Sequence, residues 1–233
     1  MNKTSIEWTD FSSNPIYATS GGKRGWFCEK VTPGCAHCYA ETLNEGRFGN
    51  GLAFIPANRE KVEFHFNETE LREWQKPRYA GKRVFVCDMT DLFGEWVPDE
   101  WLERIFAAFG QAKDVIFQVL TKRPKRMHEF VRRRCRENGE SAKFWSVFEG
   151  VAYIPTWPLS NVCLGASVEN QRWANERIPL LQSTPAAVHF VSYEPALGPV
   201  DLKLVPRWLR REVVGFSPGI DWVIVGAESG PRR

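Results

Sequence analysis

Val115-Ile-Phe-Gln-Val-Leu120 is an apolar run of strand length that leads into the turn Thr121-Lys-Arg-Pro124 and then into a helical segment. Similar runs rich in β-branched residues recur along the chain, at Arg83–Cys87, Asn161–Ser167, Ala187–Ser192 and Asp221–Val225. Most are followed by a polar turn and a helical pattern. Such alternation predicts parallel strands joined by crossover helices.

We expect one more strand before residue 83, around Asn14 to Thr19, which would complete a partial barrel. Helices are expected from about Pro98, from Lys122 to Arg136, and from Asn170 to near Gln182. The predicted fold class is α/β, a partial six-stranded parallel β/α barrel. The 233 residues are expected to form a single domain, in which residues 139–160 are a loop or small insert.

Polar side chains stand at the end of every predicted strand after residue 80. In open parallel sheets and barrels, the carboxyl ends of the strands carry the binding site. The residues concerned are Asp88, Asp91, Thr121, Lys122, Ser167, Glu169, Ser192, Glu194, Glu228 and Ser229.

Three cysteines lie within eleven residues, in a stretch that also holds Pro33 and Gly34. The chain has no apolar stretch long enough to span a membrane and no apolar leader, so we expect a cytoplasmic protein in which clustered cysteines bind metal. A four-iron, four-sulfur cluster held by Cys28, Cys35 and Cys38 would keep one iron without a protein ligand. That iron can bind a small molecule such as S-adenosylmethionine.

Basic residues crowd one predicted helix although the net charge of the chain is only +3. The helix predicts a nucleic-acid interface, because lysine and arginine neutralise phosphates. A solvated helix face is the alternative. The residues are Lys122, Arg123, Lys125, Arg126, Arg132, Arg133 and Arg134.

Seven motifs in order resemble a phage- and prophage-associated, radical-SAM-like family with a three-cysteine motif, distantly similar to spore photoproduct lyase. They are Thr4-Ser-Ile-Glu-Trp-Thr-Asp10, Cys28-x6-Cys35-x2-Cys38-Tyr-Ala, Met89-Thr-Asp-Leu-Phe93, Val119-Leu-Thr-Lys-Arg-Pro124, Leu164-Gly-Ala-Ser-Val-Glu169, Ser192-Tyr-Glu-Pro195 and Val225-Gly-Ala-Glu-Ser-Gly230. The resemblance implies a radical-SAM barrel in a bacterial or phage-infected cell. It also implies a three-Cys-motif partner protein.

The implied function is that of a radical S-adenosylmethionine enzyme. Its [4Fe-4S] cluster takes an electron from a donor protein and generates a 5′-deoxyadenosyl radical that acts on an unidentified substrate, with DNA or RNA favoured. The S-adenosylmethionine site would be formed by His37, Tyr39, Asp88, Thr121, Lys122, Ser167, Glu169, Glu194, Gly226 and Glu228. Carboxylates and hydroxyls of this set would accept hydrogen bonds from the ammonium group and the ribose hydroxyls of S-adenosylmethionine. Lys122 and Arg123 would neutralise the carboxylate of the ligand, and the glycines would let its adenine approach the backbone.

Two features differ from the pattern of the family. Six residues separate Cys28 from Cys35, where three are usual in radical-SAM proteins, and a C-terminal segment is expected beyond Arg233. A zinc-stabilised nucleic-acid-binding module, with His65 as the fourth ligand, and a non-catalytic scaffold barrel are therefore alternatives.

Overall fold

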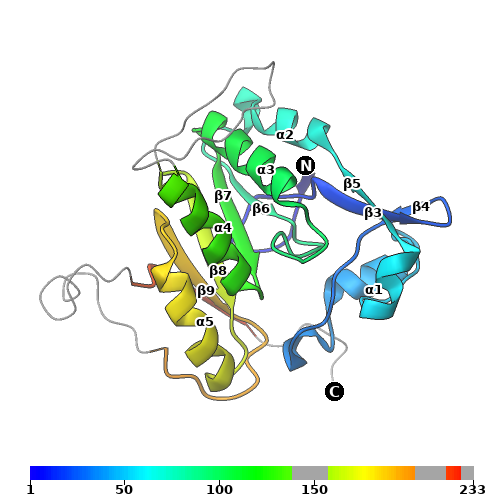
Figure 1. Cartoon of the computed structure of the whole chain (residues 1–233). Helices are drawn as coiled ribbons and strands as arrows, with labels where there is room; N and C mark the ends of the chain where they lie inside the picture. Colours follow the sequence, from blue (N-terminus) through cyan, green and yellow to red (C-terminus); the bar gives the residue numbers. More distant parts are fainter. Residues whose placement is uncertain (138–156, 203–218, 227–233) are drawn as a thin grey trace, which may run out of the picture.

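Two sheets form the framework of the chain in the computed structural model (Figure 1), which describes residues 1–137, 157–202 and 219–226. The strands are β1 (Asn2–Lys3), β2 (Phe11–Ser13), β3 (Ile16–Ser20), β4 (Lys23–Gly25), β5 (Glu63–Phe66), β6 (Arg83–Val86), β7 (Ile116–Thr121), β8 (Val162–Ser167), β9 (Val188–Tyr193) and β10 (Trp222–Val225). The α-helices are α1 (Tyr39–Glu45), α2 (Glu68–Trp74), α3 (Asp99–Gln111), α4 (Pro124–Glu137) and α5 (Gln171–Ser183). The described residues also form the short 3-10 helices η1 (Pro33–Cys35), η2 (Pro56–Lys61) and η3 (Pro77–Tyr79).

The larger sheet has seven strands in the order β1-β2-β6-β7-β8-β9-β10. All neighbours from β2 to β10 are parallel, and only β1 pairs antiparallel to β2. The prediction of a mixed α/β fold is confirmed, because the runs that became β6 to β10 are parallel and helices α3, α4 and α5 connect β6 to β9 in succession. Because these strands are parallel, their carboxyl ends meet at one edge of the sheet.

A strand does form at the position expected around Asn14 to Thr19, but its assignment to the parallel sheet is wrong. The parallel neighbour of β6 is β2, whereas β3 is the middle strand of a separate antiparallel sheet, β4-β3-β5. The alternation of buried Ile16 and Ala18 with half-buried Tyr17 and Thr19 gave β3 the clearer pattern. In β2 the buried residues are serines, so the apolar signal of a sheet strand is missing.

Helices α3, α4 and α5 lie on the same side of the large sheet (Figure 1). Helix α3 packs an apolar face on the sheet, since Phe106 and Phe109 are fully buried and the Phe109 ring stacks on Phe117 at 4.3 Å. Pro98 is the residue before the helix rather than part of its first turn. Every residue of β8 is buried, as expected for a strand covered on both faces.

Some predictions fall on residues that the structure does not describe. Residues 138–156, which make up most of the expected insert at 139–160, are among them, as is Glu228. Within the described part of the chain, no helix has the length and apolarity needed to cross a bilayer.

Candidate functional site

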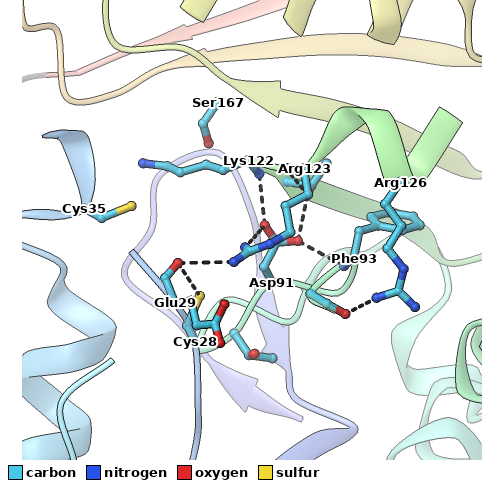
Figure 2. Close-up of polar contacts among 12 residues, drawn as sticks. Cys28, Glu29, Cys35, Asp91, Phe93, Lys122, Arg123, Arg126 and Ser167 are labelled. Atoms are coloured by element: carbon cyan, nitrogen blue, oxygen red, sulfur yellow. Dashed lines mark hydrogen bonds and ion pairs between the residues drawn. The ribbon is translucent and has the colours of Figure 1, made fainter. Parts of the chain in front are cut away.

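Asp91 is the centre of a buried polar network at the carboxyl edge of the large sheet (Figure 2). Its Oδ1 accepts from the Thr121 hydroxyl at 2.6 Å and from the Phe93 N–H at 3.0 Å. Its Oδ2 accepts from the Lys122 N–H and from Arg123 Nη1, both at 3.0 Å. These four bonds satisfy the carboxylate and fix the turn after β7 to the loop after β6.

Glu169, which follows β8, is a second buried carboxylate with no exposed surface. It accepts from the Thr32 hydroxyl at 2.8 Å and pairs with Lys122 Nζ at 2.7 Å and with Arg177 Nη1 at 3.4 Å. Arg177 also donates to the backbone carbonyl of Ser167 at 2.7 Å. Glu169 therefore joins the cysteine stretch, the end of β7 and helix α5.

Gly34 lies against the same carboxylate. A β-carbon at this position would come within 2.4 Å of Glu169 Cγ. The cysteine stretch can approach the sheet edge this closely only because residue 34 has no side chain.

Asp88, after β6, is half-buried and accepts from Asn14 Nδ2 at 2.6 Å. Burial raises the pKa of its carboxyl, and the bond from Asn14 offsets only part of that rise. The Tyr39 hydroxyl donates to the Asp88 backbone carbonyl at 2.7 Å, which places the first residue of α1 at the strand ends.

Glu194 and Gly226 are neighbours at the ends of β9 and β10. The Ser192 hydroxyl donates to Glu194 Oε2 at 3.1 Å. A β-carbon at residue 226 would lie only 2.0 Å from Glu194 Oε1, so glycine allows the carboxylate to lie over the end of β10.

The stretch that carries the cysteines is fastened to this edge at several points. Arg123 donates to the Glu29 carbonyl at 3.3 Å while its guanidinium lies 4.8 Å from the centre of the Trp96 ring. The Thr90 hydroxyl donates to the Phe27 carbonyl at 2.5 Å. As Figure 2 shows, the Cys28 and Cys35 thiols consequently lie beside the Asp91 network, with Lys122 extended toward Cys35.

The three thiols lie in different electrostatic surroundings. Burial, with a contribution from the Asp91 carboxylate, raises the pKa of Cys28 to about 12. Burial also raises the pKa of Cys38. At Cys35 burial acts in the same direction, but the Lys122 ammonium and hydrogen bonds from Val31 and Thr32 outweigh it and lower the pKa.

The arrangement of the thiols bears on the kind of metal centre that they could hold. Among the described residues, no group of three or more His, Cys, Asp or Glu side chains is close enough to hold one metal ion. A single zinc ion needs all of its sulfur ligands at ~2.3 Å, whereas an iron–sulfur cluster distributes its cysteines over separate irons. The three thiols are near enough for Cys35 and Cys38 to influence the pKa of Cys28.

A buried hydrogen-bond donor lies beside the thiols. Trp26 packs with Cys28 and Cys38 on the small cluster of Ala40, Phe54 and Met89. Its indole Nε1 is buried and has no hydrogen-bond partner in the part of the chain that the structure describes. Buried donors are rarely left unpaired, and sulfurs of iron–sulfur clusters accept such bonds.

The predicted nucleic-acid interface on α4 is largely ion-paired within the protein. Arg126 and Arg133 pair with Asp99 at 3.1 and 2.9 Å, and Arg134 pairs with Glu103. Lys125 and Arg132 are exposed. With Lys122 and Arg123, which pair with Glu169 and Asp91, most of these basic residues have an acidic partner within the protein, although Arg133 is itself exposed.

The two histidines considered from the sequence lie in different parts of the fold. His37 is exposed. His65 stacks on Tyr17 and shares a hydrogen bond with Thr19 Oγ1 at 2.8 Å, on the small sheet rather than beside the cysteines. His65 is therefore not positioned to be a fourth zinc ligand.

Sequence reasoning missed Thr32, Arg177 and Trp26 as parts of the site. Arg177 has no motif to mark it, because it belongs to the middle of α5 and reaches Glu169 only through the fold. Thr32 could have been suspected, since it directly precedes the Pro33-Gly34 turn.

Comparison with known protein families finds a match to the family described as "Protein of unknown function (DUF5131)", over residues 3–233. Neither a curated protein nor a solved structure matches the chain. A match over nearly the full length establishes membership without assigning an activity. The chain belongs to the DUF5131 family.

Proposed function

We propose that this chain is a radical S-adenosylmethionine enzyme, built on a partial β/α barrel, in which Cys28, Cys35 and Cys38 hold a [4Fe-4S] cluster. The observation that carries the proposal is the placement of the three thiols on a stretch that packs over the carboxyl edge of parallel strands. Thr32 is bonded to Glu169 there, and Tyr39 to Asp88. In parallel α/β folds this edge is where ligands bind.

When bound, such a cluster supplies the electron for reductive cleavage of S-adenosylmethionine. The protein holds the reactants in place and excludes water. Asp88 and Glu194 are the half-buried carboxylates available for the ammonium and hydroxyl groups of the ligand. Lys122, whose side chain is 20 % exposed, is the cation available for its carboxylate.

Glu169 has a different part in this proposal. Its two oxygens already accept from Thr32, Lys122 and Arg177 inside the protein. We therefore assign it the positioning of Lys122 and of the cysteine stretch. An electron donor and a three-Cys-motif partner protein are the proteins expected to act with the chain.

The test is anaerobic purification followed by iron and sulfide analysis and by paramagnetic resonance of the reduced protein. We expect a four-iron signal that changes on addition of S-adenosylmethionine and is lost in Cys35→Ala. Cys163→Ala is the matched control, because Cys163 is buried in the separate cluster of Phe190 and Ile224. Zinc in place of iron, or a signal indifferent to S-adenosylmethionine, would overturn the proposal.

A further inference from the structure

A groove of about 460 Å³ lies between the β3–β4 hairpin and the segment that follows α1. Lys23 and Arg24 line it from the hairpin, while Glu45, Arg47 and Phe48 line it from the other side. Three cations thus face a single carboxylate. Neither the proposed cluster nor the predicted basic helix uses these residues.

The hairpin holds its two cations in a fixed position. Gly21 and Gly22 both have positive φ, +55° and +76°, and Ser20 pairs with Lys23 across the turn. Two consecutive residues of positive φ form the tight turn that matches the twist of a two-stranded hairpin. Lys23 and Arg24 are therefore presented by β4 rather than by a flexible loop.

A buried asparagine pair holds the opposite wall. Asn44 donates to Asn50 Oδ1 at 2.8 Å and to the Leu52 carbonyl at 2.7 Å, and it accepts from the Trp26 N–H at 2.7 Å. Asn50 in turn donates to the Trp26 carbonyl at 3.1 Å. This network ties the segment of Arg47 to the strand end that follows Arg24, so both walls belong to one rigid unit.

The cations of the groove differ from those of α4 in their partners. Among the described residues, Lys23, Arg24 and Arg47 form no ion pair with an acidic side chain, and all three are exposed. Arg24 lies 4.0 Å from the centre of the Tyr17 ring, which itself stacks on His65. Their charge is available to an anion in solution.

An exposed aromatic ring completes the groove. Phe48 has 75 % of its surface exposed, next to Arg47. The ring contributes little to the core and is open to a ligand. A basic groove with an aromatic ring at its wall is the arrangement by which proteins bind single-stranded nucleic acid, because phosphates pair with the cations and a base stacks on the ring.

Helix α1 connects the groove to the cysteines. It begins at Tyr39, directly after Cys38, and ends at Glu45 in the groove wall. Figure 1 shows α1 next to the β3–β4 hairpin. Seven helical residues span about 10 Å, a distance that a few nucleotides of an extended strand cover.

We propose that this groove binds single-stranded nucleic acid, with phosphates between Lys23, Arg24 and Arg47 and a base on Phe48. Binding itself is independent of the cluster. Only the role of the bound strand as substrate rests on the function proposed above.

The experiment measures fluorescence anisotropy of labelled oligonucleotides of about 12 nucleotides, as single-stranded DNA, single-stranded RNA and duplex DNA. The full-length protein, purified without oxygen, is titrated between ~50 and ~200 mM salt. Three phosphate contacts predict a slope of log K against log salt of about −2 for a single strand. A preference for DNA or for RNA shows which of the two nucleic acids the groove binds.

Two variants separate charge from stacking. The triple variant Lys23→Ala, Arg24→Ala, Arg47→Ala should weaken binding roughly tenfold or more and flatten the salt slope. Phe48→Ala should also weaken binding roughly tenfold but leave the slope unchanged, because no charge is removed. Unchanged thermal unfolding of both variants verifies that the fold is intact.

The matched control removes the same charge elsewhere, through Lys82→Ala, Lys125→Ala and Arg132→Ala, all at exposed positions. It should bind like the wild type. Loss of binding in this control but not in the groove variant would overturn the inference and favour α4 as the nucleic-acid interface. Equal affinity for duplex DNA with no effect of Phe48→Ala would also overturn it.

Repeating the titration with Cys35→Ala distinguishes this inference from the proposed function. Binding that survives in a variant without iron supports the groove irrespective of the cluster. An intact cluster signal in a wild-type protein that binds no oligonucleotide rejects the groove and leaves the proposed function standing.

Discussion

The carboxyl edge of the large sheet and the groove beside the small sheet use charged residues in opposite ways. At the sheet edge, Asp91 and Glu169 are buried and every cation that meets them is paired within the protein. In the groove, Lys23 and Arg47 are exposed and have no acidic partner among the described residues. Pairing fixes the geometry of the buried charges at the sheet edge, where only the partly exposed Lys122 is proposed to reach a ligand, whereas the exposed unpaired charges of the groove attract an anion directly.

The strongest test of this contrast is Asp91→Ala. We expect the free energy of unfolding to fall by about 3–5 kcal/mol, because Arg123 is left buried without its partner. Denaturant unfolding of the metal-free protein measures the change. Asp99→Ala is the control, since that side chain is 36 % exposed and its surface pairs should contribute about 1 kcal/mol or less. Equal losses in the two variants would remove the distinction between buried and exposed pairs.

Gly34→Ala tests how rigidly Glu169 is held. The new β-carbon would overlap a carboxylate side chain with three partners, so we expect a loss of about 1–3 kcal/mol in unfolding free energy. Gly198→Ala has no atom within 4 Å of the added carbon and should stay within about 0.5 kcal/mol of the wild type. If Gly34→Ala is equally neutral, Glu169 is free to move, and its assignment as a positioning residue fails.

The pH dependence of folding stability at Asp88 gives a third comparison. Because burial raises the pKa of this carboxyl above 3.8, the folded protein binds the proton more tightly than the unfolded chain. The stability contributed by protonated Asp88 is therefore fully present below the pKa that this carboxyl has in the unfolded chain. It is lost as the pH rises through the pKa that the carboxyl has in the folded protein. Relative to the wild type, Asp88→Asn should gain stability as pH rises through that window, which unfolding midpoints at a series of pH values can measure. A difference that does not vary with pH would mean that Asp88 is not desolvated.

The smallest effect on stability is expected at Arg47→Ala. Unfolding free energy should change by less than about 0.5 kcal/mol, because the side chain is exposed. The salt slope of oligonucleotide binding should nevertheless fall by about 0.7, the contribution of one phosphate contact. A large loss of stability here would show that the groove, like the sheet edge, uses its charge for the fold.

Much of the large sheet was predictable because its strands carry strong local signals. The runs at β6 to β10 are apolar and β-branched, and polar residues follow them at the turns. The small sheet was not predicted, since β4 is only Lys23-Arg-Gly25 and β5 mixes charged and aromatic residues. These short strands are stable only through pairing with β3, which a local pattern does not report.

Within the candidate site, the sequence placed polar residues at strand ends but did not say which of them meet. Lys122 and Glu169 are 47 positions apart and pair only because β7 and β8 are adjacent and parallel. The basic residues of α4 looked like one positive surface in the sequence. Their acidic partners Asp99 and Glu103 belong to α3, and packing of the two helices brings these opposite charges together as ion pairs.

The sequence by itself determined the parallel α/β architecture, the three cysteines in one short stretch and the polar residues that end the strands, because each is a local property of the chain. Only the tertiary structure decided which charges are buried and paired, that Thr32 and Arg177 join Glu169, and that Arg47 and Phe48 lie across a groove from Lys23. The physical reason is that pairing and burial depend on contacts between residues distant in sequence, which are formed when the chain folds.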